Sequence, residues 1–294
     1  MQRAYLFPGQ GFQYVGMGKN LYKESAVVRD YFERANELLG YRITDFMFNG
    51  PAEKLDDTQI VQNAIYLLSL LTAWHKGDAF QPQMVAGHSL GETPALVAAG
   101  VLSFEDGLML MNERAVEMEK AFRATPAKMT AVIGLEDEVV EKICEGLAEI
   151  VVAANYNCPG QIVISGTVHG VERAKIKLAK AGARRLVDLQ VHGAVHSPLM
   201  QPVVYYLKKK LETISFNEPR CPIYPNVTGV ATVNIKEIKQ CLMLQQIMPL
   251  RWTTTIQNMM FDGATTFVDC GPAHVISGMA RKISREVMID AGMV

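Results

Sequence analysis

A possible nucleophile stands in a sequence that is typical of a sharp turn. Gly87-His88-Ser89-Leu90-Gly91 follows the short apolar run Met84–Ala86 and precedes the small-residue segment Ala95–Ala99. In a G-x-S-x-G turn between a strand and a helix, the glycines allow close backbone approach and the serine oxygen projects from the strand end. The N–H of Leu90 would then point to where an oxyanion forms. The same residues also suit an ordinary strand-to-helix joint, so the pattern alone assigns no reaction.

A nucleophilic serine needs a base, because its hydroxyl is hardly ionised at neutral pH. One candidate is His196, which lies in the segment Gly193–Met200 and is expected in a cleft wall. His88 is expected to support the turn, since neighbours on a tight turn point away from each other. Any single histidine is more often structural than catalytic. The six histidines of the chain are His75 and His169, both expected at the surface, His88, His192, His196 and His274.

A candidate anion-binding residue lies on the clearest helix of the sequence. Ser103–Asp106 is an acidic capping box, and apolar residues from Phe104 to Phe122 recur at spacings of 4, 3, 4, 3 and 4. Arg114 lies on the shoulder of this stripe, where a guanidinium either reaches solvent or meets an anion in a cleft. The alternative is a pair with Glu113 or Glu117 on its own helix.

A parallel sheet could position these residues. Short β-like runs, separated by helical patterns, each end in a loop of Gly, Pro or small polar residues, which predicts an α/β fold with a hydrolase-like large domain. Their loops should share one mouth, because ligands bind beyond the carboxyl ends of parallel strands. The four runs are Arg3–Phe7, Met84–Ala86, Ile223–Val227 and Thr265–Asp269.

The stretch from about Lys128 to Gln190 has a different order of expected strands and helices. Its strands and helices are expected in the order βαββαβ, which is the ferredoxin-like arrangement. We therefore predict a small ferredoxin-like domain at 128–190, inserted into a large domain made of 1–127 and 191–294. The two should pack closely.

Composition excludes several classes of protein. With 49% hydrophobic and 20% charged residues, the 294-residue chain is neither disordered nor collagen-like. The net charge of -1 provides no broad field for nucleic acid or for an anionic membrane. Five cysteines without a CxxC pair fit neither a disulfide framework nor a zinc site. No apolar run is long enough to span a bilayer, so we expect a cytoplasmic protein.

Six motifs occur in a familiar order: FPGQG at 7–11, GHSLGE at 87–92, Arg114, NYNCPGQ at 155–161, GAVHSPLM at 193–200, and PLRW at 249–252 followed by Gly271-Pro272. In these residues the whole chain resembles the malonyl-CoA:acyl carrier protein transacylases and the acyltransferase domains of polyketide synthases. The resemblance implies transfer of malonyl from coenzyme A to acyl carrier protein in fatty acid biosynthesis, by a ping-pong route through a malonyl-serine ester. It implies no metal or redox cofactor.

The resemblance also implies roles for residues. Ser89 would be the nucleophile and His196 its base, oriented by a backbone carbonyl near Gln245. Gln10 and the N–H of Leu90 would form the oxyanion hole, and Arg114 would grip the malonyl carboxylate. The remaining residues implied to contact the substrate are Gln62, Asn155 and Val195.

Five features depart from the family pattern or stay open. Val195 replaces a phenylalanine that excludes a 2-methyl branch, so weak acceptance of methylmalonyl is expected. Pro94 would distort a helix that began at Leu90. Phe12 is expected to narrow the entry, and Ala273-His274 to tune activity. The carrier protein could dock on any of three basic patches, which are Lys208–Lys210, Arg184-Arg185 and Arg281-Lys282.

Two other functions remain open at this stage. One is a thioesterase-like acyl hydrolase on the same fold, and Arg114 counts against it. The other is a catalytically silent docking protein, which would have no physical need for Ser89, His196, Gln10 and Arg114 together.

Overall fold

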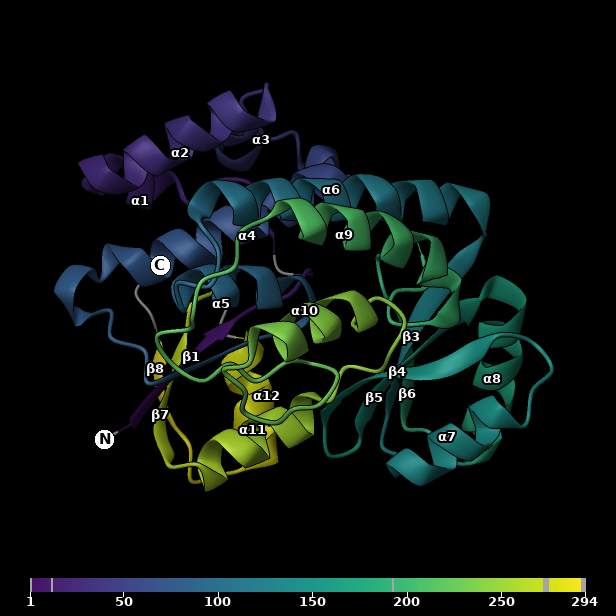
Figure 1. Cartoon of the computed structure of the whole chain (residues 1–294). Coiled ribbons are helices and arrows are strands. Elements are labelled where there is room, and N and C mark those ends of the chain that lie inside the picture. The colour runs from purple at the N-terminus through teal and green to yellow at the C-terminus, as the bar shows by residue number, and fades with distance from the viewer. Residues whose placement is uncertain (1, 12, 192, 272–274, 292–294) are drawn as a thin grey trace.

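The structure is a computed structural model that describes residues 2–11, 13–191, 193–271 and 275–291. Figure 1 shows two units side by side, one around a parallel sheet and one around an antiparallel sheet. The strands are β1 (Gln2–Phe7), β2 (Met84–Gly87), β3 (Ala127–Ile133), β4 (Val151–Cys158), β5 (Gln161–Thr167), β6 (Arg185–Asp188), β7 (Ala264–Asp269) and β8 (Met288–Ala291).

Helices surround both sheets. The α-helices are α1 (Lys19–Glu24), α2 (Ala26–Leu39), α3 (Ile43–Asn49), α4 (Thr58–His75), α5 (Glu92–Ala98), α6 (Phe104–Ala124), α7 (Asp137–Glu145), α8 (Val168–Lys180), α9 (Gln201–Thr213), α10 (Ile235–Leu244), α11 (Trp252–Phe261) and α12 (Val275–Ile283). The 3₁₀ turns are η1 (Ala52–Asp56), η2 (Gly77–Ala79), η3 (Ser89–Gly91) and η4 (Pro198–Met200). Within the described ranges, none of the helices is both long and apolar enough to cross a membrane.

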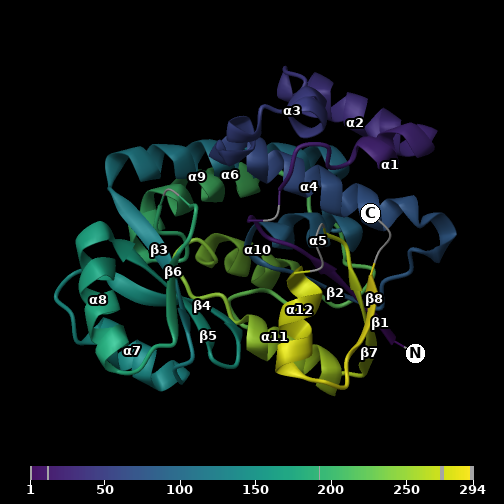
Figure 2. The same cartoon turned by 180° about the vertical axis from the view of Figure 1, so that it is seen from behind.

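The parallel sheet has the strand order β2-β1-β7-β8 and separates two hydrophobic cores. Successive side chains of a strand point to opposite faces, so Tyr5 and Phe7 of β1 join the core beneath α4, α5 and α6. Ala4 and Leu6 join the other core, with α11 and α12. Figure 2 shows α11 and α12 on the side of the sheet away from α4 and α5. The predicted α/β fold is confirmed.

One predicted strand is wrong. Ile223–Val227 does not form a strand, because Ile223 makes only isolated bridges to Val85 and Thr232. Pro222 and Pro225 lack the N–H groups that a ladder needs. The fourth strand is β8, at the other edge of the sheet.

The capping-box helix forms as predicted. α6 begins after Ser103, whose side chain accepts a hydrogen bond from the N–H of Asp106 at 3.0 Å. An N-cap of this kind stabilises a helix by about 1 kcal/mol. In Figure 1, α6 and α9 lie side by side above the sheet, and α4 lies close to α6.

The second unit has the predicted βαββαβ order, from β3 to β6. Its antiparallel sheet runs β4-β5-β3-β6, with α7 and α8 packed on it around a small core of Val132, Val140, Ile162 and Val171. Leu250 joins the two units, because its N–H donates to Ala154 O and its carbonyl accepts from Tyr156 N, each at 2.8 Å. The boundaries 1–127 with 191–294, and 128–190, stay a prediction.

Candidate functional site

A cavity of about 340 Å³ opens between the two units, at the carboxyl ends of β1 and β2. We call it the central cavity. Its walls come from the parallel sheet, the helices α4, α6 and α12, and the antiparallel sheet. It is lined by Gly9, Gln10, Gly11, Gln13, Gln62, His88, Ser89, Leu90, Arg114, Met118, Met129, Asn155, Asn157, Val163, Asp188, Leu189, Gln190, Val191, Val195, His196, Ile276 and Met279.

Ser89 lies on a strained and crowded turn. Its φ is 53°, in the left-handed region that non-glycine residues rarely adopt. A Cβ built on Gly87 would lie 1.9 Å from the backbone of Gly91, and one on Gly91 would lie 2.2 Å from the carbonyl oxygen of Phe7. Only glycine fits at either position. The turn therefore holds the serine against the end of β1 and directs it into the cavity.

This crowding predicts a large loss of stability on replacing Gly91 with alanine. The added carbon would meet backbone that cannot rotate away, so Gly91→Ala should lower the free energy of unfolding by about 3 kcal/mol. Urea unfolding measures the change. Gly278→Ala is the matched control, because Gly278 lies exposed in α12 with no atom within 4 Å of the added carbon. It should stabilise the helix by about 0.5–1 kcal/mol. Equal urea midpoints for Gly91→Ala and the wild type would contradict the close contact.

Pro94 does not distort the turn. The first turn after Ser89 is the 3₁₀ segment η3, and α5 begins only at Glu92. Pro94 is therefore the third residue of α5, where a backbone N–H has no partner within the helix. The expected distortion required a helix that starts at Leu90, and in the structure the α-helix starts two residues later.

Ser89 and His196 meet although 107 residues separate them. The Ser89 Oγ lies 2.9 Å from His196 Nε2, and His196 Nδ1 lies 2.6 Å from the carbonyl oxygen of Gln245. Because a carbonyl only accepts, Nδ1 carries the proton and Nε2 is free to accept the proton of the serine hydroxyl. Burial lowers the pKa of His196 to about 3, and the nearby charge of Arg114 acts in the same direction. The ring is therefore a neutral base at pH 7.

Backbone strain singles out the same two residues. Among the described residues, Ser89 and His196 are the non-glycine residues with positive φ, at 53° and 59°. Strained backbone persists only where the surrounding contacts over-determine it, and it gathers at functional sites. The strain supports a functional assignment for both residues without reference to their types.

Arg114 is a buried cation with unused donors. Its side chain is only 4% exposed, and its Nη1 donates to Gln62 Oε1 at 2.5 Å. Its Nε and Nη2 have no partner in the part of the chain that the structure describes. The alternative pairing with Glu117 is not seen, because that carboxylate pairs with Lys120 at 2.5 Å. Burial lowers the pKa of Arg114 to about 10, so the group is still charged at pH 7. A buried charge with free donors calls for an anionic ligand.

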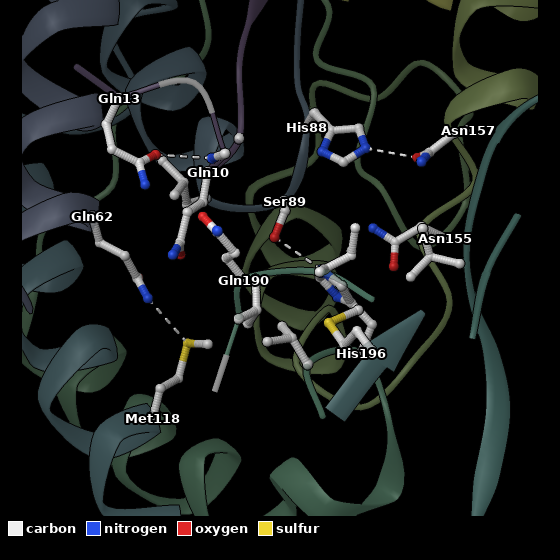
Figure 3. Close-up of a pocket in the computed structure, with 18 of the residues that line it drawn as sticks. Gln10, Gln13, Gln62, His88, Ser89, Met118, Asn155, Asn157, Gln190 and His196 are labelled. Carbon is white, nitrogen blue, oxygen red and sulfur yellow. Dashed lines mark hydrogen bonds between the residues drawn. The ribbon is translucent and has the colours of Figure 1, made fainter. Parts of the chain in front are cut away.

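Figure 3 shows how the other predicted residues surround Ser89. Gln10 and Gln62 lie on one side of the serine, and Asn155 lies on the other side near His196. The buried Asn155 Oδ1 has no partner within the described residues. The rest of the predicted set also gathers here: Leu90 and Val195 line the cavity, and Gln245 lies behind His196.

The other histidines that the structure describes are not placed to accept the proton of the Ser89 hydroxyl. His88 is half-buried and its Nε2 lies 2.9 Å from Asn157 Oδ1, away from the serine, as Figure 3 shows. His75 and His169 are exposed. His192, Phe12, Ala273 and His274 lie outside the described residues.

Sequence reasoning missed two buried polar residues behind the turn. Asn226 Oδ1 accepts a hydrogen bond from the N–H of Ser89 at 2.8 Å, and Asn226 Nδ2 donates to the carbonyl of Gly87 at 2.5 Å. Glu92 accepts from the N–H of Asn226 at 3.0 Å, and burial raises its pKa to about 7. A signal existed for Asn226, since it stands near the end of the run Ile223–Val227, and the loop after that run was expected at the mouth. Glu92 stands in the GHSLGE motif, but nothing in the pattern indicates its partners.

The chain is similar to known acyltransferases over almost its full length. The family model described as "Acyl transferase domain" matches residues 4–286. A malonyl CoA-acyl carrier protein transacylase of Bacillus subtilis is 38% identical over 97% of this chain and 91% of its own, and the Escherichia coli K12 protein of that name is 37% identical over 96% and 93%.

Solved structures agree with these matches. An acyl carrier protein S-malonyltransferase from Vibrio cholerae has a TM-score of 0.94 and 38% identity, covering 98% of this chain and 96% of its own. A type II PKS acyl-carrier protein in complex with its malonyl-transacylase also matches, with a TM-score of 0.94, 34% identity and coverages of 98% and 95%. The chain therefore belongs to the acyl transferase domain family, among the malonyl CoA-acyl carrier protein transacylases.

Proposed function

We propose that this protein transfers a malonyl group from coenzyme A to the phosphopantetheine thiol of acyl carrier protein, in fatty acid biosynthesis, through a malonyl ester on Ser89. Its relatives are named for malonyl transfer, and one structural neighbour was solved with its acyl-carrier protein. The observation that carries the proposal is one cavity with a serine–histidine pair and the partly unpartnered cation Arg114.

In the first half-reaction, Ser89 Oγ attacks the thioester carbonyl while His196 Nε2 takes the hydroxyl proton. Gln10 and the N–H of Leu90 donate to the oxyanion that forms, and each such donor lowers the barrier by about 3 kcal/mol. The carbon–sulfur bond then breaks, and the proton on His196 goes to the coenzyme A sulfur. The products are free coenzyme A and a malonyl-serine ester.

The second half-reaction reverses these roles. His196 takes the proton of the carrier thiol, the sulfur attacks the ester carbonyl, and the proton returns to Ser89 Oγ as the carbon–oxygen bond breaks. Both thiols need the same serine, so one must leave before the other enters, which is a ping-pong order. A serine, a base and fixed donors suffice, so the proposal includes no metal or redox cofactor.

Arg114 selects the acyl group. A malonyl carboxylate can accept two parallel hydrogen bonds from the planar guanidinium, which strengthens binding and fixes orientation. An acetyl group leaves the cation buried without an anion, which is costly. Gln62 holds one edge of the guanidinium at 2.5 Å, so the free donors keep a fixed direction.

The carrier protein would enter over one of two basic patches. Arg185 lies on β6 and Arg281 on α12, and both elements also contribute lining residues of the cavity. Lys208–Lys210 lie on α9, which contributes none of the described lining residues. We therefore favour the first two, where charge would steer an acidic partner and salt would weaken the encounter.

A competition assay tests the proposal. Acetyl-, malonyl- and methylmalonyl-CoA are offered together, with holo acyl carrier protein as acceptor, and the acylated carrier is identified by mass spectrometry. We expect malonyl carrier to predominate, methylmalonyl carrier to appear weakly because Val195 leaves room, and acetyl carrier to be the least abundant.

Each other outcome counts against a stated part of the proposal. Malonate released without carrier acylation would indicate an acyl hydrolase. No acylation of any kind would indicate a silent docking protein. No methylmalonyl carrier at all would remove the assignment of tolerance to Val195.

A further inference from the structure

Three polar side chains that are fully buried lie behind the central cavity and connect the serine turn to the histidine. They are Glu92 at the start of α5, Asn226, and Gln245 just after α10, and each is at most 1% exposed. None of them lines the cavity formed by the described residues. Buried polar groups of this kind need partners, so each contact among them constrains the others.

One oxygen of Glu92 receives two of these contacts. Glu92 Oε2 accepts from the backbone N–H of Asn226 at 3.0 Å and from Gln245 Nε2 at 2.8 Å. Gln245 Nε2 has two hydrogens but three acceptors within reach, since it also lies 3.0 Å from Ser89 O and 3.1 Å from Asn226 Oδ1. The contact with Glu92 is the shortest of the three. Glu92 therefore determines where the amide of Gln245 lies.

Each partner of Glu92 holds one member of the serine–histidine pair. Asn226 Oδ1 accepts from the N–H of Ser89 at 2.8 Å, which keeps the serine in its strained conformation. The carbonyl of Gln245 accepts from His196 Nδ1 at 2.6 Å, which sets the tautomer and the ring direction. The two arms meet at Glu92 Oε2, which accepts from both, and the longer contacts of Gln245 Nε2 with Asn226 Oδ1 and Ser89 O lie beside it.

We infer that Glu92 is a positioning residue for this reaction: its Oε2 holds Asn226 and Gln245 together, and so fixes the distance between Ser89 Oγ and His196 Nε2. The inference rests on the proposed function for the identity of the reaction, but the positioning of Ser89 and His196 by Glu92 does not depend on which acyl group is transferred. Without that oxygen, the buried N–H of Asn226 loses its acceptor and Gln245 Nε2 loses the shortest of its three contacts. The two residues that hold Ser89 and His196 in their positive-φ conformations are then less firmly fixed.

The chemistry of the contacts defines a conservative variant. Both contacts are donated to Oε2, so an amide oxygen at that position can accept them too. Glu92→Gln should thus preserve the arrangement, whereas Glu92→Ala removes the acceptor. Glu92→Asp keeps the charge but withdraws the oxygen by one methylene.

The experiment measures kcat and KM for malonyl-CoA, and separately the rate at which a fluorophosphonate probe labels Ser89. For Glu92→Ala we expect kcat and the labelling rate to fall together by about 10²-fold, since a displacement of about 1 Å of reacting groups has effects of this size. KM should change by less than about 3-fold, because Glu92 lies behind the cavity. Glu92→Gln should restore both rates to within about 3-fold of the wild type.

Glu117→Ala is the matched control. Glu117 is also a buried glutamate, on α6, and its partner is Lys120 at the surface. Its removal should leave the labelling rate of Ser89 unchanged. Thermal unfolding of every variant establishes that the folded protein is being compared.

Two results would overturn the inference. One is a folded Glu92→Ala protein with wild-type kcat and labelling rate, and if that variant does not fold, Glu92→Asp with wild-type rates has the same meaning. The other is an equal loss in Glu92→Gln and Glu92→Ala, which would show that the charge matters rather than the position. Labelling of Ser89 by the probe needs neither malonyl-CoA nor carrier protein. If the wild type is labelled but transfers no malonyl, the proposed function is refuted. The role of Glu92 is then tested by the labelling rates of the variants alone.

Discussion

Replacing Ser89 with alanine is expected to abolish malonyl transfer, with a fall of at least about 10⁴-fold in kcat. The loss follows from geometry, because Ser89 Oγ is the group that His196 Nε2 can deprotonate at 2.9 Å, and alanine leaves that base without a nucleophile. In the wild type, incubation with malonyl-CoA alone should add a malonyl mass to the peptide that contains residue 89. In Ser89→Ala the mass should not appear.

Ser69→Ala is the control for this prediction. Ser69 is also fully buried, on α4, and its hydroxyl donates to the carbonyl of Tyr66 on the same helix. It should keep both the acyl label and the transfer rate. Undiminished malonyl transfer by Ser89→Ala would refute the proposed serine ester in this protein, even if its relatives form one.

Replacing Arg114 with alanine is expected to remove the preference for malonyl over acetyl. The free Nε and Nη2 donors supply the charge that the far carboxylate needs, and breaking a buried ion pair costs about 3 kcal/mol or more. That energy corresponds to a fall of about 10²-fold in kcat/KM for malonyl-CoA. Acetyl transfer should not fall and should rise modestly, because acetyl has no carboxylate and no longer leaves a buried cation without an anion. Separate rate measurements with each thioester give the ratio.

Two further variants make this result specific. Arg114→Lys retains the charge but loses the planar fork, so it should recover only part of the malonyl preference. Arg123→Ala removes an exposed arginine that pairs with Glu119 at the end of the same helix, and it should behave as wild type. An unchanged malonyl preference in Arg114→Ala would assign the arginine a purely structural role on α6.

Local sequence patterns predicted much of the scaffold, because the information lies within a few residues. The capping box at Ser103 and the apolar spacing after it specify α6. The βαββαβ order of the small unit likewise follows from alternating periods of 2 and 3.6. The strand expected at Ile223–Val227 was wrong. Its apolar residues are typical of a strand, but Pro222 and Pro225 lack the N–H groups that would pair with a neighbouring strand. Whether such a group is needed depends on which strand lies alongside, and that is known only from the folded structure.

The candidate site divides in the same way. Ser89 and Arg114 were visible from their own surroundings, as a turn and as a cation on an apolar helix face. The pairing of Ser89 with His196, and the carbonyl at Gln245, came only from resemblance to a family, because no local pattern joins residues so far apart.

By itself, then, the amino-acid sequence determined the α/β class, the serine turn, the helix that carries Arg114 and the family motifs, since each depends on short-range spacing. Only the tertiary structure decided that Arg114 keeps two donor atoms without a partner among the described residues. It also decided that Glu92 contacts Asn226 and Gln245, which are 134 and 153 residues away in the chain. Contacts at such distances exist only once the chain has folded. Burial then gives them their strength, because water no longer competes for the same donors and acceptors.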